Sequence, residues 1–234
     1  MGQTEAVESL RTSNTADPTG HYTLEGSILG AGFASGDRVV VGMWDTSPVG
    51  SMLDVMWAEP DGWRTLIVPD QRIGAFISAI YTFDTVIIDE TLRRSMHGTT
   101  MSLDWSGAAL EFTLGRSAPF PPRPDWVTTH IEAPIARSVL SVETHGVSPT
   151  GVEETYKARR LRRLVDGWAV VAGRDLGSLG PPTPRCGFGF SEPPPFPSLT
   201  ELTTSISDPE GRLYGVLDHG VLDHGVLDHG VLDQ

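Results

Sequence analysis

The sequence is poor in cysteine and lysine: among its 234 residues, Cys186 is the only cysteine and Lys157 the only lysine. A single cysteine excludes an intramolecular disulfide bond and a zinc site built from several thiolates. No apolar run approaches the roughly 18 residues that a membrane span requires. The first residues, Met1 to Glu5, lack the apolar segment of a secretory signal. We therefore expect a cytoplasmic protein with no membrane partner.

Short catalytic and cofactor-binding motifs are also missing. The sequence has no phosphate-binding P-loop, no glycine fingerprint of a dinucleotide-binding fold, no G-x-S-x-G and no H-E-x-x-H. Acidic residues outnumber basic ones by 30 to 17, which gives a net charge of −13. Because nucleic-acid binding depends on neutralising phosphates, this charge disfavours a nucleic-acid partner. We expect no cofactor.

The C-terminal end carries a perfect five-residue repeat. Gly-Val-Leu-Asp-His begins at Gly215, recurs twice more and ends as Gly-Val-Leu-Asp-Gln at Gln234. Five residues turn a helix by about 140° and reverse the face of a strand, so neither structure aligns the histidines. We therefore expect a solvated, flexible tail and no metal site.

Changes in composition divide the chain into five segments. A stretch with four prolines in nine residues predicts a stiff connector between two strand-rich halves. The predicted segments are a disordered arm (1–20), a first β half with one helix (21–116, helix 70–81), the connector (117–125), a second β half with another proline-rich stretch (126–206, stretch 181–197) and the flexible tail (207–234).

The spacing of apolar residues predicts the secondary structure. Met52 to Ala58 alternates as a half-buried strand does, and 101–105 and 110–114 flank Ser106-Gly107 as a hairpin does. Five apolar residues instead recur at helical spacing after the cap residue Asp70, namely Ile73, Phe76, Ile77, Ile80 and Tyr81. The sequence therefore predicts a mainly β fold, an antiparallel sandwich or barrel of about ten strands with one packed amphipathic helix.

Asp54 is the first candidate catalytic residue. It shares one strand face with Met52 and Met56, whereas Leu53, Val55 and Trp57 share the other. If the methionine face lines an apolar cavity, desolvation raises the pKa of Asp54 and makes it a candidate acid or base. The alternative is an aspartate on a solvent-facing surface of the sheet.

His145 is the second candidate catalytic residue. It follows Ser141 and Glu143 on one face of a predicted strand, a pattern that resembles a nucleophile, an acid and a base. Residues two apart on a strand lie about 6.5–7 Å from each other, too far for the short contacts of a catalytic triad. We therefore interpret this face as a polar cavity wall or a solvated surface, with His145 as a candidate general base.

Aromatic and methionine side chains on several strands indicate an apolar cavity inside the sheet, and ligand binding there requires a volume above ~300 Å³. We expect Trp57, Tyr156 and Arg159 to contact the ligand. Arg159 belongs to a run of five cations between Lys157 and Arg163. This run is either a solvated strand partnered by acids or a site where arginines hold a carboxylate or phosphate.

Three stretches together resemble an uncharacterised protein family of high-GC actinobacteria: Trp-Asp-Thr-Ser-Pro-Val-Gly (44–50), Gly-Val-Glu-Glu-Thr-Tyr-Lys (151–157) and Phe-Gly-Phe-Ser-Glu-Pro-Pro (188–194). The similarity spans residues 25–206 and implies no activity. The strand-rich outline with one helix is also similar to acetoacetate decarboxylase-like barrels. The lysine motif of that family is absent, so no residue carries over.

Three functions are compatible with the predicted fold. The first is binding of a small, mostly apolar or carboxylate-bearing molecule in the concavity of the sheet. The second is a cofactor-independent enzyme of the lyase, isomerase or decarboxylase type, in which Asp54 and His145 face one pocket. The third is an interaction protein without a pocket, which an exposed apolar patch favours. A small-molecule ligand is the expected partner, and a homodimer is a possible one.

Overall fold

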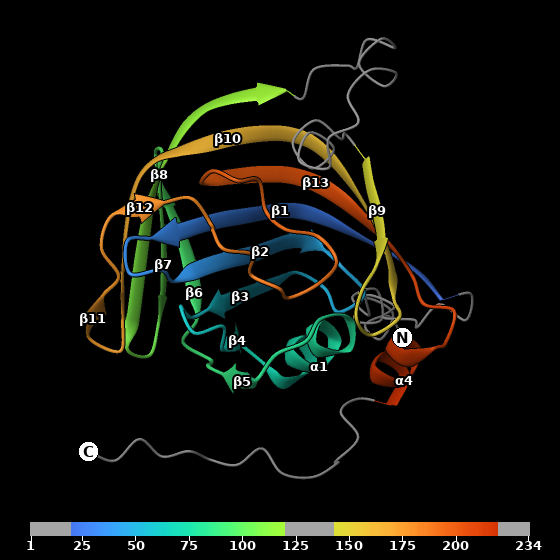
Figure 1. The fold of residues 1–234 in the computed structure, drawn as a ribbon. Helices are drawn as coiled ribbons and strands as arrows, with labels where there is room; N and C mark the ends of the chain where they lie inside the picture. The colour runs from blue at the N-terminus through green and yellow to red at the C-terminus, as the bar shows by residue number, and fades with distance from the viewer. Residues whose placement is uncertain (1–19, 120–142, 220–234) are drawn as a thin grey trace, which may run out of the picture.

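The structure is a computed structural model that describes residues 20–119 and 143–219 (Figure 1). Two helices and thirteen strands make up the described chain. The helices are α1 (Gln71–Ile80) and α4 (Arg212–His219); the strands are β1 (His21–Phe33), β2 (Arg38–Thr46), β3 (Met52–Ala58), β4 (Arg64–Val68), β5 (Thr85–Ile88), β6 (Arg93–His97), β7 (Thr100–Trp105), β8 (Ala108–Pro119), β9 (Glu143–Val147), β10 (Glu153–Val171), β11 (Arg174–Asp175), β12 (Leu179–Gly180) and β13 (Ser198–Ser207).

All the described strands belong to one sheet. Ten of them follow the order β5-β4-β3-β2-β1-β13-β10-β8-β7-β6, while β9 and β11 pair with β10, and β12 pairs with β1. Only β4 and β5, which α1 connects, pair in parallel among the described strands. The sheet curls strongly into a half-barrel that arches over α1 (Figure 1). The predicted mainly β, antiparallel fold with a packed helix is therefore confirmed, and the barrel is open.

The two predicted halves contribute neighbouring strands. β1 lies between β2 of the first half and β13 of the second, so that Ile28 pairs with both Gly42 and Thr200. β8 extends to Pro119, and the first residues of the predicted connector (117–125) therefore continue a strand. The rest of the connector and the predicted arm, apart from residue 20, lie outside the described residues.

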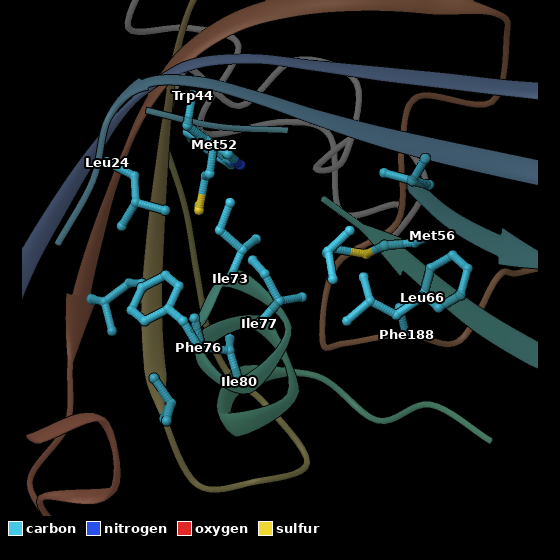
Figure 2. Packing of buried hydrophobic residues seen from close by; sticks show 14 of the residues in the cluster. Leu24, Trp44, Met52, Met56, Leu66, Ile73, Phe76, Ile77, Ile80 and Phe188 are labelled. Atoms are coloured by element: carbon cyan, nitrogen blue, oxygen red, sulfur yellow. The ribbon is translucent and has the colours of Figure 1, made fainter. Parts of the chain in front are cut away.

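The single helix expected from the sequence is α1. The Asp70 side chain accepts a hydrogen bond from the backbone N–H of Ile73 at 2.9 Å, as an N-cap does. Its buried face carries Ile73, Phe76, Ile77 and Ile80. Figure 2 shows these side chains pointing to strand residues such as Leu24 and Met52. The helix thereby fills the concave side of the sheet.

A second apolar cluster lies on the opposite face of the central strands. It joins Leu29 of β1 and Val41 of β2 to Leu103 of β7 and Phe112 of β8. The end of the sheet that contains β7 and β8 therefore covers the outer face of β1 and β2. The central strands therefore have an apolar core on each face. Because successive side chains of a strand point to opposite faces, only every second residue reaches the concave side.

The predicted flexible tail (207–234) begins with ordered structure. After β13, residues Arg212–His219 form α4, which includes the first copy of the repeat. Leu213 and Leu217, four residues apart and so on one side of the helix, are buried with α1 in the inner cluster. Burial of these two leucines is what orders the start of the tail. Among the described residues, neither helix is long and apolar enough to cross a membrane.

Candidate functional site

A cavity of about 140 Å³ lies on the concave face of the sheet. Its outer wall is a proline-rich segment, residues 187–194, which we call the strap. Its floor comes from β1, β2, β3, β10 and β13, and its apolar lining includes Ile28, Val40, Met56, Ala158, Phe188 and Leu202. Phe188 of the strap packs near Met56 and Leu66 (Figure 2). Apolar groups from distant parts of the chain thus form much of the wall, and polar side chains such as Thr144, Glu192 and Thr200 also line the cavity.

The volume of the cavity limits the size of a ligand. From the sequence we required more than ~300 Å³ for ligand binding inside the sheet, the lower bound for drug-sized ligands. The cavity on the concave face does not meet this requirement, so a drug-sized ligand does not fit. An engineered cavity of about 150 Å³ in another protein binds benzene. A larger hollow of about 320 Å³ lies beside Asp45 and Arg94, at the ends of β2 and β3. None of the buried polar atoms that lack a partner belongs to residues lining that hollow.

Backbone hydrogen bonds hold the strap in place. The Arg64 guanidinium donates to the carbonyl oxygen of Gly187 at 3.1 Å, and the N–H of Thr82 donates to the carbonyl oxygen of Phe188 at 3.2 Å. The carboxylate of Glu192 accepts from the backbone N–H of Gly187 at 3.0 Å. The strap is therefore fixed to β4, to the end of α1 and to itself.

Side-chain packing seats the strap on the sheet. The Phe190 ring stacks on the Tyr156 ring, with 5.4 Å between centroids and 11° between planes. Pro193 lies directly over Gly30 of β1, so close that a Cβ at residue 30 would collide with its ring. The irregular proline-rich stretch therefore closes the open side of the half-barrel next to the cavity.

Three side chains form a compact polar cluster at the cavity. Tyr81, the C-cap residue of α1, and Tyr156 of β10 line the cavity, and Glu154 lies two residues before Tyr156 on the same face. The Tyr81 hydroxyl lies 2.6 Å from Oε2 of Glu154 and the Tyr156 hydroxyl 2.8 Å from it, and the two hydroxyl oxygens lie 2.6 Å apart. Three short contacts therefore join three oxygen atoms.

The number of O–H protons shows in which protonation state all three contacts can be hydrogen bonds. Each tyrosine hydroxyl supplies one proton, so the two hydroxyls supply two donors for three contacts. A protonated Glu154 carboxyl supplies the third donor. Burial raises the pKa of Glu154 to about 7, although the hydrogen bonds from Tyr81 and Tyr156 lower it in part. Near neutral pH, Glu154 therefore exists in both its protonated and its ionised form.

Asp54 lies beside this cluster in a second, smaller chamber of about 20 Å³. The chamber adjoins the larger cavity, because Ile28, Val40, Met56 and Tyr81 line both. Asp54 has no exposed surface, and neither of its carboxylate oxygens has a hydrogen-bond partner. Oε1 of Glu154 and Oγ1 of Thr204, which line the same chamber, also lack partners. The chamber therefore gathers polar atoms that are unsatisfied within the described chain.

Burial raises the pKa of Asp54 to about 7. The indole N–H of Trp44 and the backbone N–H of Gly42 lower this pKa in part. Neither donor has the geometry of a full hydrogen bond to the carboxylate. Asp54 can therefore gain or lose a proton near neutral pH, and the solvent-facing alternative considered from the sequence is wrong.

The structure brings two of the predicted site residues, Asp54 and Tyr156, to the adjoining cavities and leaves three elsewhere. His145 of β9 is exposed, and its Nδ1 lies 3.0 Å from the hydroxyl of Thr155. Its neighbour Thr144 lines the cavity, so His145 points away from it. Asp54 and His145 therefore do not face one pocket.

Trp57 lies on the face of β3 opposite Asp54. Its indole N–H donates to Oδ1 of Asp37 at 2.8 Å, and its ring packs against the second apolar cluster. Arg159 is about half exposed, and its guanidinium lies 3.8 Å from the Glu25 carboxylate. Neither Trp57 nor Arg159 lines the cavity. Their predicted contacts with a ligand stay predictions.

Neighbouring acids partner part of the cationic run on β10. Besides the pair of Arg159 with Glu25, Arg160 lies 3.8 Å from Glu201 of β13. The guanidinium of Arg163 stacks over the Phe196 ring at 4.4 Å. These contacts favour a solvated strand over a site that holds a free carboxylate or phosphate.

Sequence reasoning missed Glu154 and Tyr81 as site residues. The spacing of Glu154 and Tyr156 is the signal that points to the first, since residues two apart share a strand face. Tyr81 was predicted only as the last apolar residue of the helix. Its hydroxyl reaches Glu154 because the helix ends there, in extended backbone.

Comparisons of the chain with models of protein families, with curated protein sequences and with solved structures find no match. The resemblance to an actinobacterial family and the similarity to acetoacetate decarboxylase-like barrels therefore stay predictions. Within residues 20–119 and 143–219, no group of three or more His, Cys, Asp or Glu side chains is arranged to hold a metal ion. The function must be inferred from the two cavities themselves.

Proposed function

We propose that the protein binds a small, mostly apolar molecule, about the size of a single aromatic ring, in the cavity beneath the strap. The observation that carries this proposal is the apolar-walled cavity of about 140 Å³, with the polar cluster at its edge. An apolar enclosure with a few converging polar groups is the usual form of a small-molecule site. The strap covers the ligand, and Tyr81 and Tyr156 give it a hydrogen-bonding end.

Filling the cavity tests this proposal. Ala158 lines the cavity and is only half-buried, so Ala158→Leu projects a larger side chain into the ligand's space. Ser205→Leu on the exposed face of β13 is the matched control. Native mass spectrometry of the purified chain detects a retained ligand, and calorimetry with single-ring compounds measures binding. Binding that Ala158→Leu removes and Ser205→Leu preserves supports the proposal; binding unaffected by Ala158→Leu contradicts it.

A second candidate function is cofactor-independent acid–base catalysis. It is favoured by Asp54 and Glu154, two buried carboxyls in the smaller chamber whose pKa values are both raised to about 7. Such a group can remove a proton beside a carbonyl and return it, as an isomerase does. His145 has no part in this function, because it is exposed on the other face of its strand.

Hydrogen exchange tests this second function. A panel of small ketones is incubated with the protein in deuterium oxide, and incorporation of deuterium beside the carbonyl is followed by mass spectrometry. Catalysis predicts exchange that Asp54→Asn or Glu154→Gln abolishes and that His145→Ala leaves unchanged. Exchange no faster than in buffer, with a ketone shown to bind, excludes the reaction for that ketone.

An interaction role and a homodimer remain predictions as well. Three apolar side chains are exposed at the β5 edge of the sheet: Trp63 (51%), Ile87 (42%) and Ile88 (39%). Unpaired sheet edges with exposed apolar residues favour association. Light scattering at several protein concentrations measures the mass in solution, and a monomer at all of them argues against a homodimer.

A further inference from the structure

The smaller chamber indicates the chemistry of the ligand, on the premise that the cavity binds a ligand as proposed above. Two carboxyls line this chamber of about 20 Å³, Asp54 from β3 and Glu154 from β10. Asp54 is 0% exposed and Glu154 1%. Three of their four oxygen atoms, both of Asp54 and Oε1 of Glu154, have no hydrogen-bond partner among the described residues. Three carboxyl oxygens that form no hydrogen bond with the described residues therefore line one buried chamber.

No positive group of the described chain balances these acids. Among the described residues that line either cavity, none is lysine, arginine or histidine. A buried carboxylate without a hydrogen-bonding or charged partner is strongly unfavourable. A group that brings both donors and positive charge would stabilise the ionised form of both acids.

We propose that the ligand is a small apolar amine, whose protonated ammonium group lies in the smaller chamber between Asp54 and Glu154. An ammonium group has three N–H donors, which matches the three unpartnered carboxylate oxygens. A chamber of about 20 Å³ holds one group of the size of a water molecule. The apolar body lies in the larger cavity against Met56 and Phe188. Tyr81, which lines both chambers, marks where the two parts of the ligand join.

Three competing occupants explain the chamber less well. A water molecule fits, but it is neutral and does not balance the charge of either acid in its ionised form. A carboxylate-bearing ligand, which the sequence allowed, would bring a third negative group to a chamber that already holds two acids. An uncharged alcohol satisfies one or two oxygens and supplies no charge. The ammonium group alone supplies enough donors and the opposite charge.

Three single-ring compounds of nearly equal size test the inference. Benzylamine, benzyl alcohol and benzoate differ in charge at the same position, and calorimetry with the full chain at pH 7 compares them. We expect benzylamine to bind at least about tenfold more tightly than benzyl alcohol, since charge-assisted hydrogen bonds are the stronger kind. We expect benzoate to bind most weakly. At pH 6, benzylamine binding should also release protons to the buffer, because the acids ionise as the cation enters.

Variants of Asp54 and Glu154 test whether the smaller chamber causes the preference for benzylamine over benzyl alcohol. Asp54→Asn and Glu154→Gln remove one charge each with little change of shape, and either should reduce the preference for benzylamine to less than about threefold. Asp104→Asn, on an exposed strand position, is the matched control and should keep it. Equal binding of benzylamine and benzyl alcohol overturns the amine inference while the cavity still binds ligands. Failure of all three compounds to bind instead contradicts the proposed function itself.

Discussion

The carboxyl group of Asp54 occupies the space above Gly42 on the neighbouring strand. The two residues are directly opposite each other in the β2–β3 register. A Cβ at residue 42 would collide with Oδ1 of Asp54 and with Nε1 of Trp44. The missing side chain at residue 42 therefore leaves room for the carboxyl group of Asp54. This relationship explains how a carboxylate fits into a well-packed core without a partner from the chain.

Gly42→Ala should destabilise the fold by about 1–3 kcal/mol, because the added methyl group overpacks the site. Removing the acid as well relieves the collision, so Gly42→Ala combined with Asp54→Ala should cost less than the sum of the two single changes. Urea unfolding of the four proteins measures this coupling. Additive costs would show that Asp54 does not occupy the space above Gly42.

Asp54→Asn should change how stability depends on pH. Burial raises the pKa of Asp54 to about 7 in the folded chain, against about 3.9 in the unfolded chain. Between these values the native state holds a proton that the unfolded chain has lost, so the stability of the wild type falls as pH rises from about 4 to about 7. The amide side chain of the variant cannot ionise, so the loss of stability that Asp54 causes with rising pH disappears.

Urea unfolding at pH 4 and at pH 8 tests the sign. The variant should gain stability relative to the wild type on going to pH 8, by about 1.4 kcal/mol for each unit of pKa difference. Glu154 is present in both proteins, so its own contribution cancels in the comparison. An equal difference between variant and wild type at both pH values would contradict an elevated pKa of Asp54.

Tyr81→Phe should raise the pKa of Glu154 above about 7. The Tyr81 hydroxyl donates to Oε2 of Glu154 at 2.6 Å and lowers that pKa, so its loss favours the protonated acid. Stability should fall by about 1 kcal/mol for the lost hydrogen bond. Carbon-13 NMR of the glutamate carboxyls follows the titration. Tyr214→Phe in α4 is the control and should leave the pKa of Glu154 unchanged.

Gly30→Ala should loosen the strap. The new methyl group would collide with the ring of Pro193, which packs directly on β1. Hydrogen–deuterium exchange of peptides from residues 187–194 should become faster, while exchange in β2 and β3 stays as in the wild type. Gly180→Ala is the matched control, because its Cβ would meet only the Gly32 carbonyl oxygen, at 3.9 Å. Unchanged exchange in the strap would show that Gly30 does not seat Pro193.

Leu213→Ala should destabilise the fold by about 2–5 kcal/mol, the usual cost of truncating a fully buried leucine. Leu213 is 0% exposed in the inner cluster, whereas its neighbour Tyr214 is 37% exposed. Tyr214→Ala should therefore cost much less. Thermal unfolding compares the two. Equal small effects would support the flexible tail that the sequence predicts from residue 207 onward.

The spacing of apolar residues predicted the helix and the strands in which buried residues recur at a regular interval. Alternation from Met52 to Ala58 gives β3 and places Asp54 and Trp57 on opposite faces, which the structure confirms. The same alternation shows that the two residues cannot line one cavity. β1 was not predicted as a strand, because Gly26 and Gly30 interrupt its pattern. In the structure these glycines lie where the Met43 carbonyl oxygen and Pro193 approach the strand.

The sequence by itself determined which side chains share a face and where α1 begins, because both depend on spacing between near neighbours. Only the tertiary structure decided which faces meet. Asp54, Tyr81 and Glu154 converge because β1 lies between β2 and β13, and because the sheet curls strongly, so that residues of β3 and β10 and the end of α1 line one chamber. The order of the strands and the curl of the sheet depend on pairings between distant segments. These pairings are stabilised by the packing of two apolar cores on one sheet.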